Sequence, residues 1–391
     1  MQRRIWQESS ARGDTVKIVT VVGARPQFIK AAPVSRELRK WCTEVLVHTG
    51  QHYDHNMSEA FFEDLEIPKP DYNLGLGGGS HGKQTGAMLE AIESVLIKEA
   101  PQGVLVYGDT NSTLAGALAA AKLCVPVFHV EAGLRSYNRE MPEEINRVLT
   151  DHLSDVLFCP TEVAVSNLWK EGITDNVFNV GDVMYDAFLA NIEIAKEKSK
   201  ILKEIGLSAG GYLLATVHRA ENTDNAENLN SIVGALTLLD HQIILPLHPR
   251  TRKALESANL MGRLEGCQHI RLIEPVGYLD MLALEYGSTL ILTDSGGIQK
   301  EAFFLGKPCI TLRDETEWVE TVNAGLNVLA GADLRKILDS TEQQIAALPM
   351  CELPPYFGVG EASIGICRAI GKYADHYRIL GSRSSSDHVD G

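Results

Sequence analysis

The stretch GVLVYGDTNSTLAGALAAAKLCVPVFHVEAGLR, residues 103–135, contains two apolar strand-like segments separated by one helix-like segment. The first strand-like segment ends in Asp109, the second ends in Glu131, and residues 112–123 between them are rich in small side chains. Such a strand–helix–strand unit makes the two strands parallel, so both acids belong to the carboxyl edge of one sheet. Neighbouring strands lie about 4.8 Å apart, which lets both carboxylates face one substrate. The pair predicts an enzyme rather than a scaffold.

Strand and helix signals alternate along the rest of the chain. Strands are expected at residues 16–22, 44–48, 103–108, 125–130, 156–159 and 177–180, and again at 212–217, 242–247, 270–273, 290–293 and 308–312. Repeated alternation of this kind is typical of parallel, doubly wound sheets. We therefore predict an α/β fold with two Rossmann-like doubly wound domains and a cleft between them.

The length of 391 residues also favours two domains. We expect a first domain over residues 16–187 and a second over residues 188–365, joined by a charged helical segment. A terminal helix over residues 366–380 is expected to pack back, and residues 381–391, rich in Ser and Gly, are expected to be a disordered tail.

Composition narrows the class of protein. The formal net charge is −15, which argues against a nucleic-acid partner. No apolar stretch is long enough to span a membrane, and the first fourteen residues lack the apolar core of a signal peptide. The seven cysteines form no CxxC pair, which favours reduced thiols in a cytoplasmic protein.

A phosphate site is expected where LTDSGGIQKE, residues 292–301, passes from a strand into a helix. Backbone N–H groups at a helix start bind phosphate, and Gly296 and Gly297 let the phosphate come close. Ser295 caps this helix, and Glu301, about one turn further, is able to accept hydrogen bonds from a ribose diol. An ordinary capped strand-to-helix turn is the alternative.

A second anion site is expected at the end of the first strand. Arg25 and Lys30 flank the start of the helix that follows it. A guanidinium grips a phosphate at two points, so Arg25 is the stronger candidate. The alternative is that both cations are solvated on a surface helix.

Four further residues follow strands or lie on an expected helix. His218 and His248 each follow a strand of the second half, where a histidine suits proton transfer or diphosphate binding. Glu143 and Arg147 lie four residues apart on one helix face, as a surface ion pair does. Alternatively, Glu143 is a third acid of the cleft.

Two motifs are interpreted as misleading. GGGSHGKQ, residues 77–84, resembles a Walker loop, but Gln84 replaces the Ser or Thr that would hold magnesium, so a mobile glycine loop is expected. His52 and His55 lie in a polar loop without a recognisable metal spacing. No metal site is predicted.

Taken together, these stretches resemble the non-hydrolysing UDP-N-acetylglucosamine 2-epimerases, and the likeness covers about residues 16–370. The matching pieces are Gly23-Ala24-Arg25-Pro26 with Lys30, Thr49-Gly50-Gln51-His52, Val106-Tyr107-Gly108-Asp109-Thr110, His129-Val130-Glu131-Ala132-Gly133-Leu134-Arg135, Pro142-Glu143-Glu144-Ile145-Asn146-Arg147, His218-Arg219 with Glu221-Asn222, Thr293-Asp294-Ser295-Gly296-Gly297-Ile298-Gln299 with Glu301, Gly306-Lys307-Pro308, and Arg313-Asp314-Glu315-Thr316-Glu317.

The resemblance implies a fold like that of GT-B glycosyltransferases, a homodimer, a UDP-sugar substrate, and neither cofactor nor metal. The first domain then carries the sugar and the catalytic groups, and the second binds UDP. The catalytic residues implied are Asp109, Glu131, Glu143 and His218. The substrate-binding residues implied are Arg25, Lys30, Arg135, Arg147, Ser295, Gly296, Gly297 and Glu301. The effector-binding residues implied are Gln51, Arg219 and His248. Arg219 and His248 match positions that bind an activating UDP-sugar in bacterial members, whereas the run that begins at Gln51 differs from the usual one.

The implied reaction is elimination of UDP through 2-acetamidoglucal, followed by re-addition, which interconverts UDP-GlcNAc and UDP-ManNAc. Trp318 stands where the commoner family pattern has an arginine. This change, and the run that begins at Ala24, look more like the branch acting on UDP-2,3-diacetamido-2,3-dideoxyglucuronic acid. That branch, a hydrolysing 2-epimerase and a GT-B glycosyltransferase are the alternatives.

Overall fold

The computed structural model describes residues 16–51, 68–347 and 354–386, and it divides into two compact units. The first unit comprises the chain up to Ala187 together with the chain from Tyr356 onward, and the second comprises Phe188–Pro355. The units are described one at a time below. His52 and His55, considered above, lie outside the described residues.

A seven-stranded parallel sheet forms the centre of the first unit, with strand order β3-β2-β1-β4-β5-β6-β7. The strands are β1 (Lys17–Val22), β2 (Thr43–His48), β3 (Tyr72–Asn73), β4 (Gly103–Tyr107), β5 (Val127–Val130), β6 (Val156–Cys159) and β7 (Val177–Asn179). The order reverses between β1 and β4, and open α/β sheets bind ligands beside such a reversal, at the carboxyl ends of the strands.

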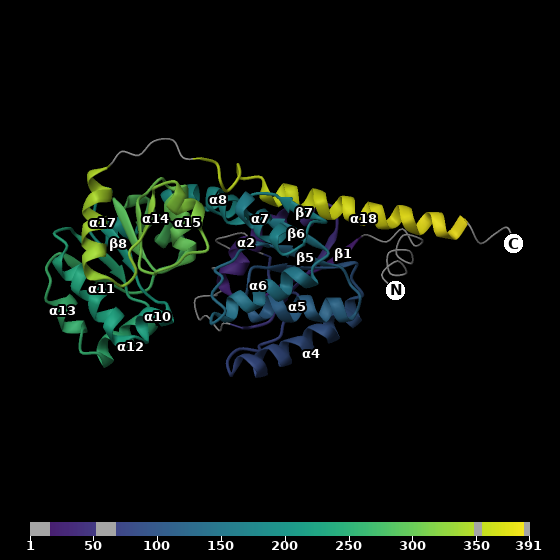
Figure 1. Ribbon diagram of the computed structural model, residues 1–391, viewed down its shortest axis with the longest axis horizontal. Helices are drawn as coiled ribbons and strands as arrows, with labels where there is room; N and C mark the ends of the chain where they lie inside the picture. The colour runs from purple at the N-terminus through teal and green to yellow at the C-terminus, as the bar shows by residue number, and fades with distance from the viewer. Residues whose placement is uncertain (1–15, 52–67, 348–353, 387–391) are drawn as a thin grey trace. The chain divides into compact units, whose positions relative to one another are not determined.

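Helices cover both faces of this sheet (Figure 1). They are α2 (Arg25–Leu38), α4 (His81–Glu99), α5 (Asn111–Lys122), α6 (Pro142–Leu153), α7 (Glu162–Lys170), α8 (Val183–Lys198) and α18 (Ala362–Ser386). The helices α4, α5 and α6 lie together on one face, and α18 packs with α2 on the other. Small residues let α5 approach the sheet closely: a Cβ at Gly116 would lie 3.2 Å from a methyl group of Val106.

The C-terminal segment returns to the first unit, and this corrects the predicted domain boundary at residue 365. Asp186 accepts hydrogen bonds from the backbone N–H groups of Ala362 and Ser363, at 3.1 and 2.8 Å, and so caps the start of α18. The ring of Tyr373 packs edge-on against Phe128 of β5. Helical signals from Ala362 onward agree with the start of α18, and the helix continues to Ser386, where a disordered tail was expected.

The second unit is built around a six-stranded parallel sheet with strand order β10-β9-β8-β11-β12-β13. Its strands are β8 (Leu213–Thr216), β9 (Ile243–Pro246), β10 (Ile270–Ile273), β11 (Leu290–Thr293), β12 (Cys309–Thr311) and β13 (Asn327–Leu329). Its helices are α9 (Ile201–Glu204), α10 (Ala220–Thr223), α11 (Ala226–Leu238), α12 (Pro249–Ser257), α13 (Met261–Glu265), α14 (Tyr278–Gly287), α15 (Gly296–Phe304), α16 (Val319–Asn323) and α17 (Leu334–Ala346).

Alternate residues of the second sheet fill two apolar cores. Leu213 and Ala215 of β8 pack in the core that includes α11 and α17, whereas Tyr212 and Leu214 pack in the core that includes α14. This is the two-residue period of a strand that is covered on both faces. The expected fold class, α/β with two Rossmann-like doubly wound halves of GT-B type, is confirmed.

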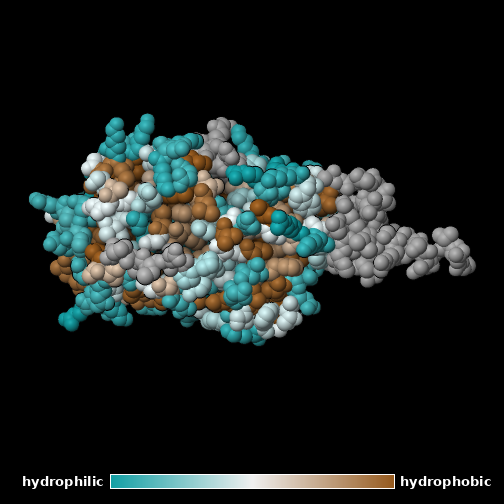
Figure 2. All heavy atoms as spheres, turned by 90° about the horizontal axis from the view of Figure 1, so that it is seen from above, coloured by the Kyte–Doolittle hydropathy of each residue, from teal (hydrophilic) through white to brown (hydrophobic). Residues whose placement is uncertain are grey.

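The outer surface mixes polar and apolar side chains over the face seen in Figure 2. Among the described residues, no helix is both long enough and apolar enough to cross a membrane. One local expectation was wrong: α4 begins at His81, so the second half of the glycine-rich run 77–84 is helical rather than a mobile loop. The side-chain amide of Gln84 there accepts a hydrogen bond from Asn111, at 2.8 Å, which ties the two helix starts together.

Candidate active site

The acid pair lies where two neighbouring strands of the first unit end. Tyr107 of β4 is paired with Val130 of β5, so Asp109 and Glu131 leave the same edge of the sheet, as predicted. Glu131 has a φ of 66°, a left-handed conformation that costs free energy in any residue with a Cβ. Gly108 takes up a similar φ of 64° without that cost. The two turns therefore point both acids away from the strand direction.

Glu131 pairs with a lysine from the first helix of the unit. Lys30 Nζ lies 2.5 Å from Glu131 Oε2, and the Glu131 side chain is only 3% exposed. Lys30 was predicted to bind substrate phosphate. The structure gives it a carboxylate partner instead, because the first turns of α2 lie beside the end of β5.

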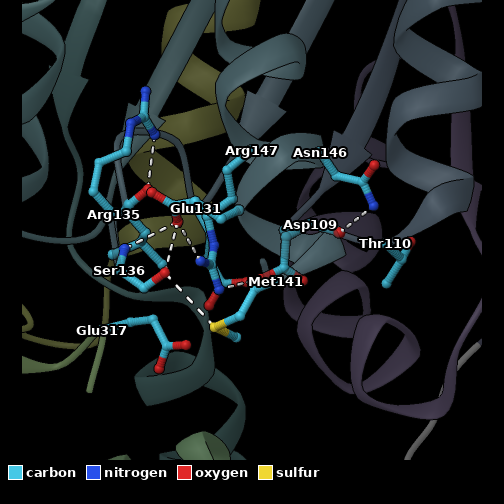
Figure 3. Close-up of polar contacts among 12 residues, drawn as sticks. Asp109, Thr110, Glu131, Arg135, Ser136, Met141, Asn146, Arg147 and Glu317 are labelled. Atoms are coloured by element: carbon cyan, nitrogen blue, oxygen red, sulfur yellow. Dashed lines mark hydrogen bonds and ion pairs between the residues drawn. The ribbon is translucent and has the colours of Figure 1, made fainter. Parts of the chain in front are cut away.

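Asp109 pairs with an arginine from α6, as Figure 3 shows. Arg147 Nη2 lies 2.6 Å from Asp109 Oδ2, and Nη1 lies 2.7 Å from Glu144. Asn146, the preceding residue, donates to the Asp109 carbonyl at 2.9 Å. On α6, Arg147 contacts Glu144, three residues before it, and the ion pair suggested between Glu143 and Arg147 stays a prediction.

Glu144 also shapes the loop before α6. It accepts hydrogen bonds from the backbone N–H groups of Ser136 and Tyr137, both at 2.9 Å. Burial alone would raise the pKa of Glu144, but these donors and Arg147 hold it below its ordinary value. Glu143, in the first turn of α6, is half-buried.

Gln27 is a site residue that sequence reasoning missed. Its side-chain oxygen accepts from the N–H groups of Gly23 and Ala24 at the start of α2, at 2.7 and 3.1 Å. Its nitrogen donates to the Tyr107 carbonyl, at 2.7 Å, at the end of β4. Gln27 therefore joins the turn that presents Arg25 to the turn that presents Asp109. The sequence offered one signal for this role: Gln27 is the third residue of a helix that follows Gly23, a position from which a Gln side chain often bonds back to the backbone at the helix start.

Arg135 was predicted to bind substrate. Its guanidinium is 1% exposed and is held by Asp151 at 2.7 Å and by both oxygens of Glu171 at 2.7 Å each. Nη1 also donates to the Leu134 carbonyl, so most of its N–H donors have partners within the first unit. The residue stabilises the turn after β5, where Asp151 also accepts from the N–H of Gly133 at 3.1 Å.

Gln51 was predicted as an effector residue, and its side-chain oxygen has a structural partner. It accepts from Ser112 N at 2.9 Å and from Ser112 Oγ at 2.7 Å, near the start of α5. A Cβ at Gly23 would come within 1.9 Å of the same Ser112 Oγ, so this packing requires glycine there.

In the second unit, the predicted phosphate loop forms a capped helix start. Ser295 is the N-cap of α15, and its hydroxyl accepts from Ile298 N at 3.5 Å. The indole nitrogen of Trp318 lies 3.3 Å from the place that a Cβ of Gly296 would occupy. Lys300 Nζ lies 3.9 Å from the Trp318 ring centre, so a buried lysine stands beside the residue that replaces the family arginine.

His218 and Arg219 are held by one buried acid. Asp294, at the end of β11, accepts from His218 N at 3.0 Å and from Arg219 N at 2.9 Å. Burial lowers the pKa of His218 below its ordinary value, and Asp294 opposes this only in part. The ring is therefore neutral at pH 7 and available to donate or accept one hydrogen bond. The His248 ring lies 5.7 Å from it, centre to centre.

Glu301 is buried on α15 and accepts a hydrogen bond from the Tyr278 hydroxyl at 3.0 Å. Glu285, two turns along α14 from Tyr278, is fully buried and shares a hydrogen bond with Glu301. Burial and the neighbouring Glu301 raise the pKa of Glu285 well above its ordinary value. Glu285 therefore keeps its proton to a higher pH than an exposed carboxyl group does.

We expect Glu285→Gln to stabilise the protein increasingly as pH rises above about 4.3, the ordinary pKa of a glutamate. In the unfolded chain, Glu285 ionises above about pH 4.3, whereas the folded chain keeps its proton, so wild-type stability falls as pH rises. Gln removes that loss. Urea unfolding at several pH values measures the difference, with the exposed Glu256→Gln as control. A difference that does not change with pH would contradict the buried neutral acid.

The described part of the chain contains no group of three or more His, Cys, Asp or Glu side chains arranged to hold a metal ion. What the first unit does contain is a pair of acids, each bonded to a cation, and the second contains a capped helix start with two glycines. Two Rossmann-like halves with these features define the class of two-domain α/β enzymes that act on nucleotide-linked substrates.

Residues 36–371 match the protein family described as UDP-N-acetylglucosamine 2-epimerase, and the chain belongs to this family. It is 56% identical over 357 residues to a UDP-N-acetylglucosamine 2-epimerase homolog of Methanococcus maripaludis, covering 91% of this chain and 99% of that one. It is 53% identical over 366 residues to the UDP-2,3-diacetamido-2,3-dideoxy-D-glucuronate 2-epimerase of Pseudomonas aeruginosa, covering 91% and 100%.

A solved structure agrees with the assignment. The UDP-GlcNAc 2-epimerase of Methanocaldococcus jannaschii, in complex with UDP-GlcNAc and UDP, is 48% identical and superposes with a TM-score of 0.85. The match covers 91% of this chain and 100% of that one. The resemblance drawn from the motifs is confirmed, and the protein is an enzyme of the epimerase class.

Proposed function

We propose that this enzyme interconverts UDP-GlcNAc and UDP-ManNAc without net hydrolysis. The observation that carries the proposal is the acid pair at the ends of β4 and β5, each acid bonded to its own cation. Inverting C2 requires one group to remove a proton and another to deliver one. Relatives named UDP-N-acetylglucosamine 2-epimerase, at 50% and 48% identity, support the substrate.

The reaction proceeds by elimination and re-addition. A base takes the C2 proton, the electron pair of the C2–H bond forms a C1=C2 double bond, and the C1–O bond breaks with its electrons leaving on UDP. The intermediate is 2-acetamidoglucal. UDP oxygen then attacks C1 while a proton arrives on the opposite face of C2, so no atom is gained or lost.

Asp109 and Glu131 are the proton-transfer groups of this proposal. Arg147 bonds to Asp109 and Lys30 bonds to Glu131, so a cation holds each acid beside the end of its strand. The acid that removes the C2 proton must be ionised, and the acid that delivers one must be protonated. Glu143 is a third acid beside the sugar.

In this proposal, groups of the second unit and Arg25 bind the departing UDP. The N–H groups at the start of α15, with Ser295, Gly296 and Gly297, suit a diphosphate, and Glu301 suits the ribose diol. Neutral His218 donates to the diphosphate or relays a proton. These contacts stabilise the charge that develops as the C1–O bond breaks.

Incubation with UDP-GlcNAc in D₂O, followed by NMR, tests the proposal. We expect UDP-ManNAc with deuterium at C2. Free N-acetylmannosamine with equimolar UDP would point to a hydrolase, and no change of donor without an acceptor would point to a glycosyltransferase. A parallel incubation with UDP-2,3-diacetamido-2,3-dideoxyglucuronic acid tests whether a chain with Trp318 at this position acts on that sugar. Conversion of this uronate but not of UDP-GlcNAc would overturn the proposed substrate.

We further propose a homodimer in a reducing, cytoplasmic compartment. The compartment follows from four free, buried cysteines: Cys42, Cys159, Cys309 and Cys367. Burial raises the pKa of each thiol and so keeps it protonated and unreactive, as suits a reducing environment in which disulfides do not form.

Light scattering of the purified chain tests the dimer: a mass of 42.8 kDa would show a monomer, and twice that mass a dimer.

A further inference from the structure

His129 is a buried histidine of β5 that the reaction described above leaves unused. Its side chain is 0% exposed. Its Nδ1 lies 2.7 Å from Asp151 Oδ1, and its Nε2 lies 2.8 Å from the carbonyl oxygen of Gly108. Both ring nitrogens therefore face oxygen atoms at hydrogen-bond distance, in a place that water does not reach.

Those two contacts decide which protons the ring carries. A carbonyl oxygen is only an acceptor, so Nε2 must be the donor to Gly108. A neutral ring would then turn the bare lone pair of Nδ1 toward Asp151, which is tolerable only if Asp151 holds a proton. Burial acts to raise the pKa of Asp151, but Arg135 bonds to its carboxylate at 2.7 Å and the N–H of Gly133 donates to it at 3.1 Å, and the pKa lies below its ordinary value. Asp151 is therefore a carboxylate, and Nδ1 carries the second proton.

The Gly108 carbonyl belongs to the peptide unit that leads into Asp109. A hydrogen bond from a charged donor is about twice as strong as one between neutral groups, so it holds that peptide in one orientation. Gly108 has the left-handed φ of 64°, and the same turn is held by its N–H, which donates to Val130 O at 2.9 Å. The direction in which Asp109 leaves β4 thus depends on the His129 ring, which contacts the Gly108 carbonyl.

We infer that His129 is a positioning residue: its doubly protonated imidazolium, held by Asp151, clamps the Gly108 carbonyl and fixes the direction of Asp109. The inference deepens the proposed function and rests on it for the turnover measurement. Its first test does not depend on turnover.

The first test is NMR of the full chain labelled with ¹⁵N-histidine, at pH about 7.5, above the ordinary histidine pKa of about 6.5. We expect the His129 ring to show one-bond N–H couplings at both nitrogens. The chain has 12 histidines, so the spectrum of His129→Asn assigns the signals that disappear. A ring with one protonated nitrogen and one nitrogen bearing a lone pair would overturn the inference.

The second test separates positioning from a merely structural role. We expect His129→Asn to lose about 100-fold in kcat, because Asp109 is misdirected, while the Kd for UDP stays within about threefold. His269→Asn is the matched control, since His269 Nε2 also reaches a backbone carbonyl, that of Leu236, at 3.2 Å, but in the second unit. We expect that control to keep its kcat.

Unchanged kcat in His129→Asn, or a parallel loss of UDP binding, would overturn the positioning role. If His129→Asn does not fold, the coupling measurement still decides the protonation state, with assignment from through-bond correlations to the backbone. A wild-type chain that turns over no UDP-sugar would overturn the proposed function but would leave the coupling measurement to decide the imidazolium.

Discussion

We expect Asp109→Asn and Glu131→Gln each to lower turnover about 10²- to 10⁴-fold while UDP still binds. An amide has the shape of the carboxylate but neither accepts nor delivers a proton at C2. The local structure survives the change: Arg147 keeps its 2.7 Å bond to Glu144 when Asp109 is replaced. The Lys30 side chain is 19% exposed, so it reaches water when Glu131 is replaced.

Three measurements distinguish this loss from a loss of folding or binding. Turnover and C2 deuterium exchange report proton transfer, calorimetric titration with UDP reports binding, and thermal unfolding reports stability. Glu90→Gln, at an exposed position of α4 in the same unit, is the control and is expected to keep its turnover. Wild-type exchange and turnover in both acid variants would remove the pair from the mechanism.

We expect Asp151→Asn to destabilise the protein by about 3–5 kcal/mol, because it removes the shared anion from a buried group of charges. Asp151 is 0% exposed and bonds to His129, Arg135 and the N–H of Gly133. With asparagine there, the buried Arg135 guanidinium and the His129 ring lose the carboxylate that both contact. Urea unfolding measures the loss as a shift in midpoint at constant slope.

Glu171→Gln is the matched control for this prediction. Glu171 bonds to the same Arg135 but is 26% exposed, so its removal is partly compensated by water, and a loss of about 1 kcal/mol is expected. The loss of stability in Asp151→Asn is also expected to depend on pH. Because the pKa of Asp151 is lowered in the folded protein, the stabilisation that its carboxylate provides is present above about pH 4 and is lost as pH falls through the pKa of the folded state. Equal losses in the two variants, independent of pH, would contradict this account.

Local patterns in the sequence were sufficient for the fold class and for the place of the acid pair. A strand buried on both faces reads as an apolar run, and the turn residues after it mark where it ends. Asp109 and Glu131 therefore follow β4 and β5 as expected. The phosphate-type helix start at Ser295 was equally visible, because a capped helix after a strand is encoded within ten residues.

Only the tertiary structure decided which partner each charged side chain takes. Arg135 and Arg147 look alike as cations beside a predicted site, yet Arg135 is enclosed by Asp151 and Glu171, and Arg147 reaches Asp109. Sequence spacing suggested Glu143 as the partner of Arg147, whereas the folded chain joins Arg147 to Glu144, three residues before it, and to Asp109 at the end of β4.

Long-range contacts also decided the domain boundary and the role of Gln27. The last helix joins the first unit because Asp186, 176 residues before Ala362 in the chain, caps it. Gln27 joins two turns that lie 80 residues apart. The sequence by itself determined which residues lie at the carboxyl ends of the strands, because that depends on short-range pattern. The structure alone decided which of those residues are bonded to one another, because pairing depends on how distant segments pack.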